Sequence, residues 1–166
     1  MPMKLLVRSF VVVVVGLSFG ACRQADGPMP VPSEDVQQEL GDVVRDLQNV
    51  AAKDPQAPND LASDLRKYAG RRDAEPTVDE LTRRTVTALN GIELSEQAAQ
   101  RLAHSLWVSI AARELSERQV ESLQSDMQLM LTSLGVAESN AQLVAAQVGD
   151  VQGAVGDRAR RWYELF

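Results

Sequence analysis

Cys22 is the only cysteine and His104 the only histidine of this 166-residue chain. Any thiol or imidazole chemistry of this sequence must therefore come from these two side chains. A thiolate is a nucleophile or a metal ligand, and an imidazole is a general base or a metal ligand. His104 lies beside Gln97 and Gln100 on the polar side of a predicted helix, with no second ligand or acid at a recognisable spacing. We therefore predict a surface histidine. A single cysteine excludes an internal disulfide.

Other signatures of catalysis are missing from the sequence. We find no nucleophile motif, no phosphate-binding loop, no glycine fingerprint for dinucleotides and no cysteine metal cluster. The acidic pairs Glu34/Asp35 and Asp79/Glu80 fall in the first turns of predicted helices, where the helix dipole favours negative charge. We predict no catalytic residue, no cofactor and no metal, and we favour a protein that is not an enzyme while leaving that question open.

A basic, then apolar, then small-residue segment precedes Cys22. Lys4 and Arg8 supply the positive charge, residues 10–21 are apolar or small, and two small residues come directly before the cysteine. This layout is typical of a secretory signal. As a helix, residues 10–21 would rise about 18 Å, whereas the hydrocarbon core of a bilayer is about 30 Å thick. A cleaved signal is therefore favoured, and a retained signal-anchor helix is the alternative.

The residues Phe19-Gly20-Ala21-Cys22 resemble the cleavage box of bacterial lipoprotein signal peptides, which typically reads Leu, a small residue, Gly or Ala, and Cys. The last three positions fit, and Phe19 departs from the usual aliphatic residue. The resemblance implies that residues 1–21 are a signal peptide and that Cys22 becomes the first mature residue with a diacylated thiol. Two or three acyl chains make such a tether effectively permanent. A free thiol at a signal junction is the other interpretation.

The resemblance also implies a location. Some lipoprotein-sorting systems retain proteins at the inner membrane when Asp follows the lipidated cysteine, and Arg23 in this position favours the outer membrane. We expect a lipid-anchored protein at the cell membrane or outer membrane, facing the periplasm or the exterior. Residues 22–32 then form the lipidated cysteine and a proline-rich spacer. Alternating prolines favour an extended, polyproline-like segment. Such a spacer would hold the domain roughly 20–30 Å from the membrane surface.

The charge balance bears on possible partners. The chain has 17 Lys and Arg against 23 Asp and Glu, a formal net charge of −6. Removal of residues 1–21 would take away Lys4 and Arg8 and no acid, leaving the remainder more negative. Nonspecific nucleic-acid binding needs clustered basic residues, so we predict no nucleic-acid partner. We expect membrane attachment to come from the lipid on Cys22.

Residues 33–166 are predicted to form one all-α domain, a small bundle of about five to six helices. Apolar residues recur at offsets of three and four, between recognisable helix starts and stops. No credible strand follows the signal. The predicted helices span residues 34–51, 60–69, 77–90, 96–112, 117–134 and 138–164.

Serine residues mark three of the predicted helix starts, because Ser33, Ser95 and Ser116 each precede an acidic first turn. Thr77 and Glu80 are predicted to form a capping box at another start. The tetrapeptide Glu-Leu-Ser-Glu around Ser95 recurs around Ser116. One interpretation is a helical repeat that builds a solenoid. Reuse of one start signal is favoured, since only the helix starts match.

The last predicted helix contains Gly149, Gly153 and Gly156 on one flank of its apolar stripe. Each glycine costs a helix about 1 kcal/mol relative to alanine. Close approach of a neighbouring helix would compensate for this cost. The other interpretation is a break or kink that leaves two shorter helices.

The end of the same segment is the partner surface that we would test first, with Arg158, Arg161, Trp162 and Phe166 as its residues. One interpretation is an amphipathic surface that contacts anionic headgroups or a protein partner. In the other, the arginines complement the negative end of the helix dipole and the aromatic residues complete the core.

These features predict a membrane-tethered bacterial lipoprotein with a non-enzymatic helical domain that binds a protein partner or supports an envelope assembly. The alternative is a helical small-ligand binder or enzyme whose polar residues converge only in three dimensions. A pocket lined by carboxylates with His104 or arginine side chains would favour the alternative, and a solid core would disfavour it.

Overall fold

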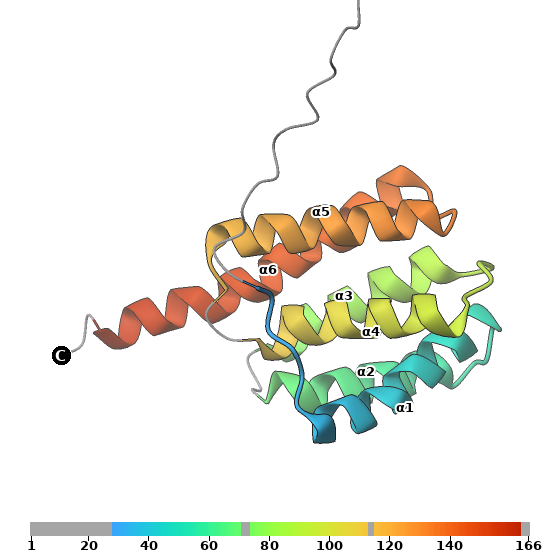
Figure 1. Ribbon diagram of the computed structural model, residues 1–166, viewed down its shortest axis with the longest axis horizontal. Coiled ribbons are helices and arrows are strands. Elements are labelled where there is room, and N and C mark those ends of the chain that lie inside the picture. The colour runs from blue at the N-terminus through green and yellow to red at the C-terminus, as the bar shows by residue number, and fades with distance from the viewer. Residues whose placement is uncertain (1–27, 71–73, 113–114, 164–166) are drawn as a thin grey trace, which may run out of the picture.

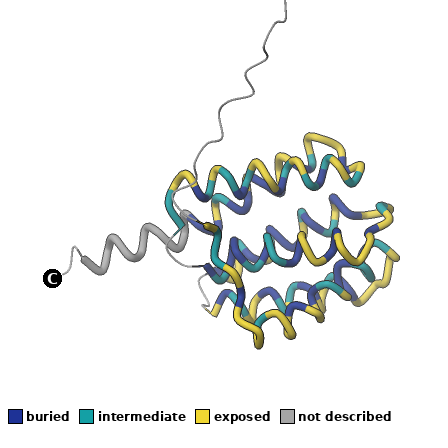
Figure 2. Tube along the Cα trace, viewed as in Figure 1, coloured by how far each residue is buried: buried dark blue, intermediate teal, exposed yellow. Residues whose placement is uncertain are grey.

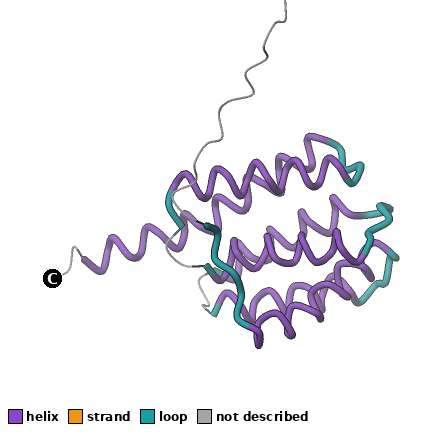
Figure 3. Tube along the Cα trace, viewed as in Figure 1, coloured by secondary structure: helices purple, strands orange, loops and turns teal. Residues whose placement is uncertain are grey.

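The structure, a computed structural model, describes residues 28–70, 74–112 and 115–163, with side chains described as far as residue 152. Within these residues the chain forms six α-helices and no strand, which confirms the predicted all-α bundle (Figures 1 and 3). The helices are α1 (Glu34–Ala51), α2 (Ala57–Ala69), α3 (Glu75–Leu89), α4 (Glu96–Ala111), α5 (Glu117–Ser133) and α6 (Glu138–Tyr163).

The three serine caps are confirmed. The side chains of Ser33, Ser95 and Ser116 accept hydrogen bonds from backbone N–H groups of the first turns of α1, α4 and α5, at 3.5, 3.3 and 3.3 Å. At Ser116 the motif is a complete capping box, because Oε1 of Gln119 accepts a return bond of 3.0 Å from the Ser116 N–H. Such caps satisfy backbone donors that the helix leaves unpaired, and each is worth about 1 kcal/mol.

Two predicted helix starts are wrong, and proline is the reason in both. Helix α2 begins at Ala57 rather than residue 60, with Pro58 inside its first turn. Helix α3 begins at Glu75, with Pro76 in its first turn and Ala74 as a cap that makes no side-chain bond. Proline fits the first helical turn because its missing N–H is not needed there. The predicted capping box of Thr77 with Glu80 is therefore absent.

The first four helices form a body in which each helix packs against at least two others, while α5 and α6 form a C-terminal hairpin. In this hairpin α6 packs against α3 and α4, and α5 reaches the body mainly through α6. Figure 2 shows the buried residues along the helix sides that face one another. The core is largely aliphatic; its fully buried members include Leu47, Leu61, Leu81, Leu102, Leu106 and Met127.

Helix α6 is continuous past all three of its glycines, so of the two interpretations left open, the break or kink is not found. At Gly149 the side chain of Gln124 from α5 lies so close that an added Cβ would collide with its Nε2 atom. The contact is with the end of a flexible side chain, so a larger residue at this position would require Gln124 to move. Gly153 and Gly156 lie outside the part with described side chains. In Figure 1 the red C-terminal turns of α6 extend beyond the ends of the other helices.

Candidate functional site

The residues singled out for lipidation and for partner binding lie at the two ends of the chain. Cys22 and Phe166 lie outside the described residues. The backbone at Arg158, Arg161 and Trp162 belongs to the last turns of α6, and their side chains are outside the described part. The described side chains belong to the bundle between these two ends. Within the bundle, the candidate sites are grooves and buried polar groups.

A groove of about 580 Å³ runs between α1 and α4. Leu40, Gly41 and Val44 of α1 contribute its apolar surface, and no atom lies within 4 Å of a Cβ placed at Gly41. The sequence pattern did not reveal this groove, because it depends on how two helices far apart in the chain are spaced. The exposed Gly41 in the middle of α1 was the one local signal of missing side-chain volume.

One end of this groove is walled by the segment that leads into α1. Val31 and Pro32 line it, and Val31 is 77% exposed although it is apolar. The segment is held to the bundle, because Pro32 is buried and its carbonyl accepts a bond of 2.9 Å from Nε2 of Gln37. Met29 also packs against the core. The last residues of the predicted spacer therefore contact the domain.

The polar lining of the α1–α4 groove contains both charge signs. Arg45 of α1, Glu96 of α4 and His104 of α4 all contribute to it. Arg45 forms an ion pair with Asp42, and Glu96 accepts a bond of 3.4 Å from Nε2 of Gln100. The groove thus combines an apolar surface with charged and amide groups, which is the composition of many small-molecule sites.

His104 lies on the polar side of α4, as predicted, but it is half-buried rather than fully exposed. Its ring stacks on Trp107, with ring centroids 6.1 Å apart and an angle of 24° between the planes. His104 and Gln100 line both the α1–α4 groove and a second groove of about 630 Å³ between α4 and α5. Among the described residues, no group of three His, Cys, Asp or Glu side chains could hold a metal ion.

The α4–α5 groove results from the peripheral position of α5. Because α5 packs mainly against α6 and only weakly against α4, a space remains between α5 and α4. Met130 and Leu134 line the space as half-buried residues, and Leu129 is 70% exposed. Arg101 stands on the α4 wall and Asp126 on the α5 wall.

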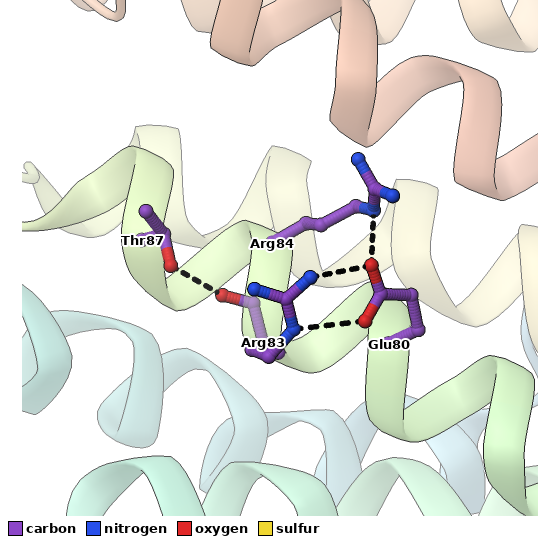
Figure 4. Close-up of polar contacts among 4 residues, drawn as sticks. All are labelled: Glu80, Arg83, Arg84 and Thr87. Carbon is purple, nitrogen blue, oxygen red and sulfur yellow. Dashed lines mark hydrogen bonds and ion pairs between the residues drawn. The ribbon is translucent and has the colours of Figure 1, made fainter.

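A carboxylate on α3 binds two arginines, as Figure 4 shows. Glu80 accepts bonds of 2.8 and 2.6 Å from Nε and a terminal nitrogen of Arg83, and its Oε1 lies 2.6 Å from Nε of Arg84. The hydrogen bond from Arg83 is the main reason why the pKa of Glu80 is lowered. Thr87 donates to the Arg83 carbonyl at 2.8 Å. The charges of Glu80, Arg83 and Arg84 are thus paired with one another within α3, so we assign these contacts a structural role.

Asp46 is the functional group that sequence reasoning missed. It lies on α1 among core positions and is only 6% exposed, with its Oδ2 atom buried and without a hydrogen-bond partner. The pKa of Asp46 is raised to about 6, first by burial and then by the nearby negative charges of Asp64 and Asp60 on α2. No spacing rule identifies such a residue, because its burial depends on where α2 crosses α1.

Gln152 is a second buried polar group, and it joins the hairpin to the body. Its Nε2 lies 3.1, 2.6 and 3.2 Å from the carbonyl oxygens of Val108, Ser109 and Ala112 at the end of α4. Terminal carbonyls of a helix have no partner within the helix. A side chain of α6 therefore supplies the cap that α4 lacks in its own sequence.

Among the described residues, no helix is both long and apolar enough to cross a bilayer. Comparisons with protein-family models, with curated proteins and with solved structures found no match to this chain.

Proposed function

We propose that this chain is a bacterial lipoprotein, tethered to an envelope membrane through Cys22, whose helical domain binds a protein partner. The observation that carries the proposal is the position of the sole cysteine at the end of the Phe19-Gly20-Ala21-Cys22 box, directly after a basic and apolar segment. The all-α bundle agrees with it, since a lipid tether needs no spanning helix in the domain. Its destination, the cell membrane or outer membrane, belongs to the same proposal.

Replacement of Cys22 by serine tests the tether. The wild-type chain should fractionate with membranes, and Cys22→Ser should appear unprocessed or in the soluble fraction, because the acylated sulfur is lost. Ser109→Cys with Cys22→Ser is a useful control, since it restores a thiol at a buried site of α4 without restoring the box. Membrane fractionation of Cys22→Ser at the unchanged processed size would contradict the proposal.

The partner surface is proposed at Arg158, Arg161 and Trp162 in the last turns of α6, together with Phe166, which lies outside the described residues. Two observations support this choice. The helix is continuous to Tyr163, and its final turns extend past the other helices in Figure 1. A helix that extends past its bundle offers backbone that neighbouring helices do not cover, which is where a partner gains access.

Co-purification with the native tether intact tests this surface. Arg158→Ala with Trp162→Ala should remove at least one partner that the wild-type protein retains. The matched control is Arg101→Ala with Leu129→Ala, which also deletes one arginine and one large apolar residue, but at the α4–α5 groove. If the control loses the partner and the α6 double variant keeps it, the binding surface is the groove and the assignment to α6 is wrong.

A second candidate function, small-ligand binding, is favoured by the α1–α4 groove. Its volume of about 580 Å³ lies within the usual range of roughly 300–1,000 Å³ for ligand sites, and Arg45, Glu96 and His104 are among its lining residues. The probe 1-anilinonaphthalene-8-sulfonate should bind the native protein there. Gly41→Leu should weaken binding at least about tenfold by filling open space, and the exposed substitution Ala146→Leu should leave it unchanged. Equal binding by both variants would exclude the groove as the probe's site.

A further inference from the structure

Asp46 lies where α1 packs against α2, in the interior of the four-helix body. Its neighbours along the buried side of α1 are Val43, Leu47 and Val50, each at most 5% exposed. An ionised carboxylate in such a place loses most of its hydration, and it needs positive charge or donors in return. The buried Oδ2 atom of Asp46 has no hydrogen-bond partner. The surroundings therefore favour the neutral acid.

The helix facing Asp46 supplies further negative charge. Asp64 of α2 lies within hydrogen-bonding reach of the Asp46 carboxyl group and is 16% exposed, and Asp60 lies one turn earlier on the same helix. A hydrogen bond between two carboxyl groups requires a proton on one of them. Asp46 is the more deeply buried partner, so it is the group that holds the proton, and its O–H donates to the Asp64 carboxylate.

Two positive charges lie near this pair, and their ion pairs are with Asp42 and with Asp64 rather than with Asp46. Arg45, which precedes Asp46, forms its ion pair with Asp42, and Lys67 binds Asp64 from the solvent side. Several other charged side chains of α2 and α3 form ion pairs of their own. Asp79 of α3 pairs with Arg66 of α2, Glu80 of α3 holds Arg83 and Arg84, and Glu96 of α4 lines the groove with Arg45. Of the cations named above, Arg45 lowers the pKa of Asp46, and its effect is smaller than those of burial, Asp64 and Asp60.

We propose that the α1–α2 contact is a pH-responsive latch, closed when Asp46 is protonated and hydrogen-bonded to Asp64 and loosened when Asp46 ionises. Ionisation places two negative charges at one buried contact and removes the only proton between them. If α1 separates from α2, or if water enters between them, the repulsion between the two carboxylates falls and Asp46 regains hydration. Because α1 also forms one wall of the α1–α4 groove, loosening of this contact would alter the groove's shape.

The direction of the pH dependence follows from the two states of the chain. In the folded protein the pKa of Asp46 is about 6, above the ordinary value of 3.8 that applies to the unfolded chain. The folded state therefore binds more protons between these values, and the stabilisation is fully present below about pH 4. It is lost as the pH rises through about 6. Most paired carboxylates, such as Glu80 with its lowered pKa, act in the opposite direction.

Urea unfolding of the full-length chain in a non-denaturing detergent tests the latch at pH 4.0 and 7.5. Relative to Asp46→Asn, the wild-type unfolding constant should rise by about 60-fold more between these two pH values, because asparagine keeps the shape and cannot ionise. Asp42→Asn, on the same helix but exposed, should retain the wild-type pH dependence. Equal pH dependence of the wild-type protein and Asp46→Asn would overturn the proposal.

Two measurements on the wild-type protein keep the proposal testable if Asp46→Asn does not fold. Carbon-13 NMR of the Asp46 carboxyl should give a titration midpoint near 6, and a midpoint near 4 would overturn the latch. Hydrogen exchange, corrected for the intrinsic effect of pH, should show that protection of α1 and α2 falls between pH 5 and 7.5 while that of α5 and α6 stays. A uniform fall across all helices would overturn the assignment to one contact.

Discussion

The four-helix body and the C-terminal hairpin both bury polar side chains, and two of them, Asp46 and Gln152, differ in how their hydrogen-bonding groups are satisfied. In the body, Asp46 has a buried oxygen without a hydrogen-bond partner and faces the negative charge of Asp64. In the hairpin, Gln152 donates to carbonyl oxygens at the end of α4. A buried polar group stabilises a contact when its bonds are complete and weakens it when they are not. The body therefore contains one contact that we propose to be pH-sensitive, between Asp46 and Asp64. The hairpin, although less enclosed, is joined to the body by the hydrogen bonds of Gln152.

Core truncation should separate the two regions most strongly. Leu102→Ala, at a fully buried site of α4, should lower the free energy of unfolding by about 2–5 kcal/mol. Leu123→Ala on α5 should cost less, because α5 packs mainly against α6 and is open on the α4 side. Urea unfolding gives the free energies, and hydrogen exchange locates the effect. Protection should fall in every helix for Leu102→Ala and chiefly in α5 for Leu123→Ala; the reverse pattern would contradict the division into body and hairpin.

Removal of the link between the regions should have the next largest effect. Gln152→Ala leaves the terminal carbonyls of α4 without their donor and should lower the free energy of unfolding by about 1–3 kcal/mol. Exchange protection should fall at the end of α4 and in α6. Gln147→Ala, which truncates another buried glutamine of α6, is the matched control and should cost less. Equal losses for the two variants would show that burial of the side chain, and not the cap, is what matters.

The smallest expected losses in the free energy of unfolding are at the helix caps. One cap from each region, Ser116 in the hairpin and Ser95 in the body, can be compared. Ser116→Ala removes two bonds of the hydroxyl in the hairpin, one accepted from the Gln119 N–H and one donated to Gln119 Oε1, whereas Ser95→Ala removes a single bond in the body. Each should cost about 1 kcal/mol, with the larger loss at Ser116. A domain of this size should lose roughly 2–4 °C in Tm per kcal/mol. A larger loss for Ser95→Ala would show that the bond from the Ser116 hydroxyl to Gln119 Oε1 adds nothing.

Local sequence signals predicted the helices well because their causes are local. Ser33, Ser95 and Ser116 mark true starts, and the left-handed residues Gly70 and Gly135 follow true ends, since capping depends on bonds within one turn. Proline was ambiguous, because the same residue that ends one helix fits the first turn of the next. Pro58 and Pro76 were therefore placed outside helices that contain them.

The candidate sites were harder to predict because they depend on contacts between distant segments. Asp46 looks like an ordinary polar position of α1 until α2 places Asp64 beside it. Gln152 caps a helix that ends about forty residues earlier in the chain. The α1–α4 groove depends on helix spacing as well as on Gly41. By contrast, the proposal for Cys22 rests on contiguous residues, and it stands as a sequence-based prediction.

Intact-mass spectrometry of the protein from the membrane fraction tests the central claim most directly. The account predicts a mature chain that begins at Cys22, lacks residues 1–21 and carries the added mass of at least two acyl chains on that residue. Detection of the intact Met1 end, or of a chain processed before Cys22 without any acyl mass, would contradict it.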